Sequence, residues 1–193
     1  MDADQPHRAR HLLERVHTIE KVVIEQIDVL ESMSPQDFLE FRKNLAPASG
    51  FQSVQFREIE FLSGLKDSRY LDRLASTSDE TQRLERRLAE PTVWDAFCTL
   101  LDRRGLPMPP DDRATRRASL LAMARARDAE FYLSESLLTY DELFAIWRQR
   151  HVLMVERQIG SKTGTGGSTG ASYLRTTLDK RFYPELWDLR SFL

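Results

Sequence analysis

A glycine-rich segment, KTGTGGSTG at residues 162–170, has the composition of a binding loop. It holds four of the chain's eight glycines, and glycine is costly to order because it has the most backbone freedom to lose. Hydroxyl side chains lie among the glycines, at Thr163, Thr165, Ser168 and Thr169. Hydroxyls beside glycine amides can bind a small anionic or zwitterionic group; the alternative is an ordinary flexible connector.

The order of residues in this segment argues against a nucleotide-phosphate loop. A P-loop needs G-x-x-x-x-G-K-[ST] after a strand, whereas Lys162 precedes the glycines and the upstream residues predict a helix. The dinucleotide pattern G-x-G-x-x-G also fails, because Thr169 stands where the third glycine belongs. A small charged ligand and a plain connector remain open.

His151 is the second candidate for chemistry, because it lies on an apolar helical stripe just before the glycine-rich segment. That stripe also contains Leu143, Trp147, Met154 and Val155. A histidine in such a place is often only a core residue, but it is also how a helix presents an imidazole to haem iron. The other three histidines, His7, His11 and His17, lie near the N-terminus, where we expect exposure to solvent.

The elements that must position these residues are helices. Apolar residues recur at steps of three and four in the first of them, at Leu12, Val16, Ile19, Val23, Ile27 and Leu30. Ser34 and Pro35 predict the start of the next helix. Thr77 and Ser78 can cap a helix over 80–90. Further helices are predicted over 56–64, 92–104, 114–133 and 140–159, the last with a capping box formed by Thr139 and Glu142. No segment shows strand-like alternation, so we expect an all-α bundle in a single domain, residues 1–193.

Composition limits the classes of function. The chain has 193 residues with 41% hydrophobic and 30% charged residues, which is typical of a globular domain with a core. The formal net charge of −2 argues against nucleic acid and acidic membranes as partners. Cys98 is the single cysteine, which excludes an internal disulfide. Neither a signal peptide nor a membrane span is evident, so we expect a cytoplasmic protein.

Two long strings resemble the tryptophan 2,3-dioxygenase family. They are EFRKNLAPASGFQSVQFREIEFLSG at 40–64 and WRQRHVLMVERQIGSKTGTGGSTGASYLRTT at 147–177. The C-terminal RFYPELWDLRSF is similar to the family too, whereas residues 65–138 match only in helical character. The resemblance implies an all-α, haem-dioxygenase-like enzyme with haem b as cofactor. It would use O₂ to oxidise L-tryptophan to N-formyl-L-kynurenine, the first step of tryptophan catabolism by the kynurenine pathway.

The resemblance also implies roles for individual residues. His151 matches the axial ligand of the haem iron. Arg42 matches the arginine that binds the substrate carboxylate, for which the planar guanidinium is well suited. Phe38, four residues earlier on the same helical face, matches an aromatic residue of the indole pocket. Ser49 matches a pocket hydroxyl, and Thr165 matches the threonine that meets the substrate ammonium and carboxylate. Arg57 and Glu60 lie in the first string, and we interpret them as a structural ion pair.

The chain also departs from the family pattern. The family's HQxxELW-like motif, with a histidine on the distal side of haem, is not found before Arg42. We therefore expect a chain that lacks the family's front portion, and we identify no catalytic residue. Ile27 stands where the family has a tryptophan. His17 lies in a segment that matches a later part of the family, so it is not assigned the distal role.

Three functions remain open from the sequence. The first is the dioxygenase, impaired or not by the missing portion. The second is a haem-binding protein without turnover that uses His151 alone. The third is a helical interaction protein. Without the front portion, Val16, Val23 and Leu30 should be exposed, which predicts a homo-oligomer, either a dimer or a tetramer.

Overall fold

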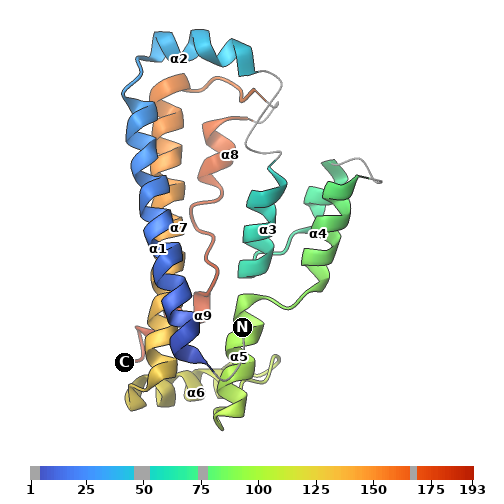
Figure 1. Ribbon diagram of the computed structural model, residues 1–193, viewed down its shortest axis with the longest axis vertical. Coiled ribbons are helices and arrows are strands. Elements are labelled where there is room, and N and C mark those ends of the chain that lie inside the picture. Colours follow the sequence, from blue (N-terminus) through green and yellow to red (C-terminus); the bar gives the residue numbers. More distant parts are fainter. Residues whose placement is uncertain (1–4, 46–52, 74–77, 166–168) are drawn as a thin grey trace. The chain divides into compact units, whose positions relative to one another are not determined.

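The computed structural model describes residues 5–45, 53–73, 78–165 and 169–193, and every regular element in these ranges is a helix (Figure 1). The α-helices are α1 (Pro6–Glu31), α2 (Pro35–Arg42), α3 (Val54–Ser63), α4 (Asp79–Ala89), α5 (Val93–Arg103), α6 (Arg113–Ala126), α7 (Ala129–Ile159), α8 (Ala171–Arg175) and α9 (Pro184–Leu189). Two 3₁₀ helices accompany them, η1 (Lys43–Leu45) and η3 (Ser68–Arg73). The all-α prediction is confirmed. None of the described helices is both long and apolar enough to cross a membrane.

Capping side chains set the starts of several helices where the sequence predicts them. The Ser34 hydroxyl accepts a hydrogen bond from the Asp37 amide at 3.2 Å, and Pro35 occupies the first turn of α2. Ser78 caps α4 in the same way. Thr92 and Asp95 form a reciprocal capping box at the start of α5. Each cap satisfies backbone amides that have no partner within their helix.

The predicted helices over 114–133 and 140–159 have the wrong boundaries. The first breaks after Ala126, because Arg127 adopts a left-handed conformation with φ of 56° and its amide donates to the Met123 carbonyl. Helix α7 then runs unbroken through the supposed capping box. The Thr139 hydroxyl donates to the Glu135 carbonyl at 3.0 Å, a bond within α7 rather than a cap.

The chain forms two compact units. The first comprises Met1–Arg15, Val54–Asp141 and Arg181–Leu193, and the second comprises Val16–Ser53 and Glu142–Lys180. The long helices α1 and α7 contribute residues to both units. That residues 1–193 form one domain stays a prediction.

The first unit is organised around a buried carboxylate. Asp141 is inaccessible to solvent, and its Oδ2 accepts hydrogen bonds from the amides of Phe182 at 2.9 Å and Tyr183 at 3.0 Å. The same oxygen accepts a bond from the Trp187 indole at 2.9 Å. Because three donors meet one oxygen, Asp141 fixes the C-terminal segment and α9 on helix α7.

The predicted ion pair between Arg57 and Glu60 is confirmed, and it is buried. The guanidinium of Arg57 donates to the Glu60 carboxylate one turn along α3. The same guanidinium lies 3.9 Å from the ring centroid of Tyr70. The pair therefore has a structural position within the first unit.

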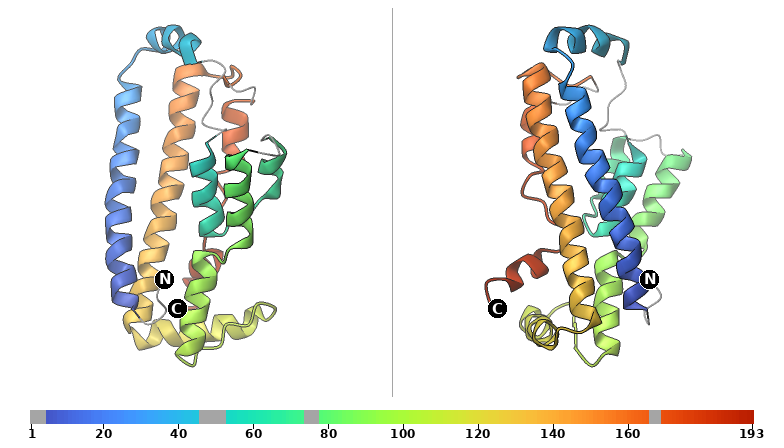
Figure 2. Two further views of the ribbon diagram at one scale, coloured as in Figure 1. Left: turned by 45° about the vertical axis from the view of Figure 1, so that its right-hand side comes forward. Right: turned by 60° about the vertical axis from the view of Figure 1, so that its left-hand side comes forward.

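In the second unit, α1 from Val16 onward lies beside α7 from Glu142 onward (Figures 1 and 2). Arg150 pairs with Asp28 and Glu31, and the Gln158 amide donates to the carbonyls of Leu30 and Met33 at 3.3 and 3.2 Å. Helix α2 lies beyond the C-terminal end of α7 (Figure 1). Because α1 lies beside α7 and leads into α2, the end of α2 lies near the segment that follows α7 (Figure 1).

Helix α1 buries a different face from the one that its apolar residues predict. Ile27 is buried, but most of the apolar stripe faces solvent. The exposed fractions are 55% for Leu12, 36% for Val16, 60% for Ile19, 41% for Val23 and 44% for Leu30. The expectation that Val16, Val23 and Leu30 are exposed is confirmed. The expectation that His17 is exposed is wrong, because its position on α1 faces inward and leaves it 9% exposed.

Candidate functional site

Arg42 joins the two sequence strings that carry the family resemblance. It is the last residue of α2, and its guanidinium donates a hydrogen bond to the carbonyl oxygen of Thr163, 121 positions along the chain. Its side chain is half-buried rather than extended into solvent. The fold therefore holds a guanidinium, the group suited to a carboxylate, against the backbone of the glycine-rich segment.

Phe38 lies one turn before Arg42 on α2 and is half-buried. The four-residue spacing places both side chains on one face of this helix, as the sequence predicts. Thr165, two residues beyond the carbonyl that Arg42 binds, is also half-buried. Ser49 lies outside the described residues.

His151 lies on α7, eight residues before the end of that helix at Ile159, or about 12 Å along the axis at 1.5 Å per residue. Its ring stacks on the ring of Trp147, with centroids 5.1 Å apart and planes 20° apart. Over the parts of the chain that the structure describes, the imidazole makes no hydrogen bond. Both ring nitrogens are therefore open to another partner.

The protonation state of His151 suits a metal ligand. Burial lowers the pKa of the imidazole below its ordinary value of 6.5. The ring is therefore neutral at pH 7 and keeps the lone pair that binds iron. Among the described residues, no three His, Cys, Asp or Glu side chains cluster where they could hold a bare metal ion. A single neutral imidazole suits an iron whose other ligands come from a macrocycle.

The structure brings together some of the predicted site residues and not others. Arg42, Phe38, Thr165 and His151 all belong to the second unit. Arg42 is joined to the glycine-rich segment through the Thr163 carbonyl, and Thr165 is part of that segment. Within the described residues, no hydrogen bond, ion pair or ring contact joins His151 to the other three.

Residues that hold the ends of the glycine-rich segment were missed by the sequence analysis. Gly170 has φ of 66° and packs against the carbonyl of Lys162, and Arg175 on α8 pairs with Glu156 on α7. The concentration of glycine signalled close backbone approach in general. It did not show which glycine makes the close backbone contact, because that depends on where the two ends of the glycine-rich segment meet in the fold.

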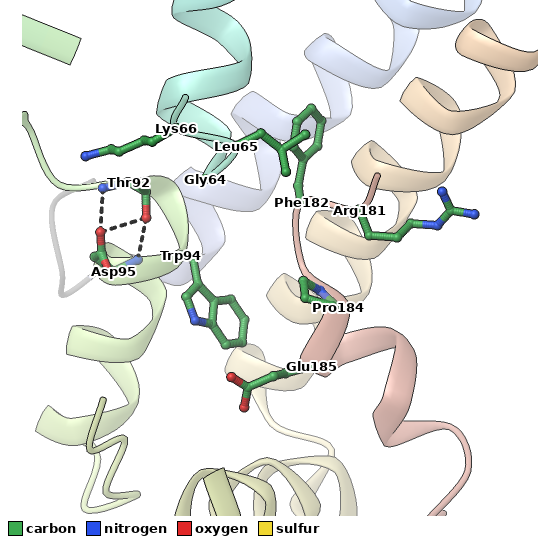
Figure 3. A pocket seen from close by; sticks show the side chains of 10 residues that line it. All are labelled: Gly64, Leu65, Lys66, Thr92, Trp94, Asp95, Arg181, Phe182, Pro184 and Glu185. Carbon is green, nitrogen blue, oxygen red and sulfur yellow. Dashed lines mark hydrogen bonds between the residues drawn. The ribbon is translucent and has the colours of Figure 1, made fainter. Parts of the chain in front are cut away.

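A pocket of about 430 Å³ lies in the first unit, and its polar side chains are engaged by the protein itself (Figure 3). Lys66 donates to the carbonyls of Leu88 and Glu90, and Thr92 and Asp95 bind each other. Glu185 accepts from both Nε and Nη2 of Arg116. None of the residues matched to the family's substrate site lines this pocket, so it is not the candidate site.

Comparison with known proteins covers nearly the whole chain. The family model described as Tryptophan 2,3-dioxygenase matches residues 2–108 and 112–193, so the match includes the middle of the chain that resembled the family only in helical character. A tryptophan 2,3-dioxygenase of Nocardioides sp. is 58% identical over 187 residues, which are 96% of this chain and 70% of that relative.

Two further tryptophan 2,3-dioxygenases extend the comparison. That of Herpetosiphon aurantiacus is 41% identical over 202 residues, covering 99% of this chain and 77% of the relative. That of Myxococcus xanthus is 37% identical over 207 residues, covering 100% of this chain and 71% of the relative. The chain belongs to the tryptophan 2,3-dioxygenase family.

Proposed function

We propose that this chain is a haem-dependent dioxygenase that oxidises L-tryptophan with O₂ to N-formyl-L-kynurenine. Membership of the family and the names of its relatives support tryptophan as the substrate. The structural observation that best supports the proposal is the hydrogen bond from Arg42 to the Thr163 carbonyl. It joins the two matched strings in the same unit that contains His151.

Haem b is the proposed cofactor, and His151 is its proposed protein ligand. The neutral imidazole, open on both nitrogens and stacked on Trp147, supports this assignment. Haem, when bound, supplies the activation of O₂. The stacking on Trp147 limits rotation of the imidazole, so that α7 presents it in one orientation.

The protein's other proposed task is to bind and orient the amino acid. Arg42 would pair with the substrate carboxylate, and the Thr163 carbonyl that it now binds would give up that donor. Thr165 would meet the ammonium and the carboxylate, and Phe38 would pack against the indole. Orientation is the chief contribution that such residues make to rate.

Binding of L-tryptophan to the ferrous, haem-loaded chain tests the proposal. Arg42→Leu removes the charge-assisted pair and should cost roughly 2–4 kcal/mol, a thirtyfold to thousandfold loss in Kd or kcat/KM. Tryptamine lacks the carboxylate and should respond little to this change. If L-tryptophan and tryptamine bind alike to the unaltered chain, and N-formylkynurenine does not form under air, the proposal fails.

The haem ligand has its own test. His151→Ala should abolish stoichiometric haem binding, seen as loss of the Soret band in a titration. His11→Ala is the matched control, because His11 is an exposed histidine on α1 and should leave binding unchanged. Equal haem affinity in both variants would overturn the assignment.

We also infer a homo-oligomer, either a dimer or a tetramer. The exposed apolar side chains of α1 support it, since a monomer seldom leaves such a row uncovered.

A further inference from the structure

The backbone on the N-terminal side of Thr165 continues directly from α7. The Gly160 amide donates to the Glu156 carbonyl at 2.9 Å, and the Lys162 amide donates to the Ile159 carbonyl at 3.2 Å. Gly160 has φ of 60°, the left-handed conformation that commonly ends a helix. Lys162 is therefore held at a fixed place relative to the last turn of α7.

Gly170 brings the other end of the segment to the same place. Its φ is 66° and its ψ is −132°, a combination that essentially only glycine adopts. A Cβ at this position would lie 2.5 Å from the carbonyl oxygen of Lys162 and 3.8 Å from the amide nitrogen of Gly164. The bare backbone of Gly170 thus packs against Lys162, and any side chain would push the two apart.

An ion pair outside this contact holds the helix that follows. The Nε of Arg175 on α8 lies 2.6 Å from Oε1 of Glu156 on α7, and Glu156 is also the residue whose carbonyl binds Gly160. The side chains are 64% and 28% exposed, so the pair adds little to global stability. Its position is more informative, because Arg175 is the last residue of α8 and the pair ties that end of the short helix, five residues after Gly170, to the last turns of α7.

The Thr163 carbonyl accepts a bond from Arg42, but the substrate carboxylate would replace that bond, so it is not one of the lasting restraints. Thr165 lies between two backbone positions that the fold restrains, with Lys162 before it and Gly170 after it. Displacement of a binding group by about 1 Å can cost a hundredfold in rate, so restraints of this kind matter to a substrate site.

We propose that Gly170 and the Glu156–Arg175 ion pair are positioning residues for the substrate: they hold the backbone at Lys162 and Gly170 together and so place Thr165. The inference rests on the proposed function, since it assigns Thr165 to the amino-acid end of the substrate. Neither Gly170 nor the ion pair touches substrate in this scheme. Both act through the position of Thr165.

Gly170→Ala tests the contact, with Gly105→Ala as its matched control. Gly105 has φ of 78° but nothing within 4 Å of its missing Cβ, so alanine there adds backbone strain without a clash. In the full, haem-loaded ferrous chain, Gly170→Ala should weaken L-tryptophan binding roughly tenfold or more. Binding of 3-methylindole, which lacks both the ammonium and the carboxylate, should change less than about twofold in either variant. A general loss of structure would weaken both ligands.

Limited trypsin digestion gives a readout that needs no substrate. Lys162 is exposed, and trypsin would cut the peptide bond between Lys162 and Thr163. The carbonyl group of that bond is the group against which Gly170 packs. Cleavage after Lys162 should accelerate in Gly170→Ala and not in Gly105→Ala.

The ion pair is tested separately, which keeps the inference open to refutation if Gly170→Ala does not fold. Glu156→Gln should weaken L-tryptophan binding about threefold or more and leave 3-methylindole unchanged. The double variant Glu156→Arg with Arg175→Glu restores the pair and should recover most of that loss. Glu135→Gln is the control. Glu135 also lies on α7, but it belongs to the first unit and pairs there with Arg190.

The outcomes separate the two proposals. If L-tryptophan binding depends on Arg42, but Gly170→Ala and Glu156→Gln behave as their controls do, the positioning role is wrong and the proposed function stands. If the unaltered chain binds L-tryptophan no better than 3-methylindole, the proposed function fails and the positioning role with it. Accelerated cleavage after Lys162 together with the selective loss of L-tryptophan would support both.

Discussion

The guanidinium of Arg42 donates to the carbonyl of Thr163, so a side chain from α2 is held by the backbone of a segment that follows α7. A carbonyl is a weaker partner for a guanidinium than a carboxylate is, because it carries no charge. The bond therefore keeps Arg42 in place without preventing exchange for an amino-acid carboxylate.

Arg42→Lys should separate charge from geometry at this position. Lysine keeps the positive charge but not the planar fork that pairs with both carboxylate oxygens. We expect L-tryptophan affinity to fall about tenfold, equivalent to about 1.4 kcal/mol and less than the loss in Arg42→Leu. Titration of the three proteins side by side checks the order. Unchanged affinity in Arg42→Lys would show that the fork is irrelevant, whereas a loss equal to that of Arg42→Leu would show that charge without the fork contributes nothing.

Asp141→Ala should unfold the first unit readily. It leaves two backbone amides and the Trp187 indole without their acceptor in a buried site, at a cost of roughly 3–5 kcal/mol. Urea denaturation followed by circular dichroism measures the change. Asp188→Ala is the control, because that side chain is 52% exposed in its pair with Arg113 and should cost less than about 1 kcal/mol.

The single thiol should be unreactive in the folded chain. Burial, and then the nearby carboxylates of Glu185 and Asp95, raise the pKa of Cys98 to about 12. Because the thiolate is the reactive form, modification at pH 8 should be roughly a thousandfold slower than for an ordinary cysteine. Reaction with a chromogenic disulfide reagent, with and without urea, measures this. The rate in the folded chain should rise with pH up to about 12, and a plateau near pH 9 would contradict the shifted pKa.

The oligomer should depend on the exposed apolar face of α1. Ile19 is 60% exposed, and Ile19→Glu would place a charge in an interface built on that face. We expect sedimentation velocity to show a shift toward the 22 kDa chain. Ile59→Glu on α3, where the isoleucine is 44% exposed, is the control. A monomeric unaltered chain at micromolar concentration would contradict the inference at once.

Local signals in the sequence predicted much of this fold, and long-range geometry limited the rest. Ser34 with Pro35, and Ser78, cap helices as predicted, because a cap depends only on residues within one turn. The break at Arg127 was missed, because a left-handed arginine is set by its surroundings and not by propensity. The burial of His17 was also missed, because the apolar residues of α1 predicted that a different face of the helix is buried.

The candidate site divides in the same way. The matched strings predicted that Phe38 and Arg42 share a helical face, and α2 confirms that relation. The partner of Arg42 could not be read from either string, because a backbone carbonyl carries no side-chain signal. Gly170 was one of four equivalent glycines until its distance to Lys162 set it apart.

Because the Trp147 ring stacks on His151, the fluorescence of Trp147 should report whether haem is bound to the chain. An indole 5.1 Å from the imidazole would transfer its excitation energy to any porphyrin bound there and lose its fluorescence. The other two tryptophans, Trp94 and Trp187, belong to the first unit. Comparison with a Trp147→Phe variant would isolate the emission of the indole that contacts His151, so cofactor loading can be followed by fluorescence without any added dye.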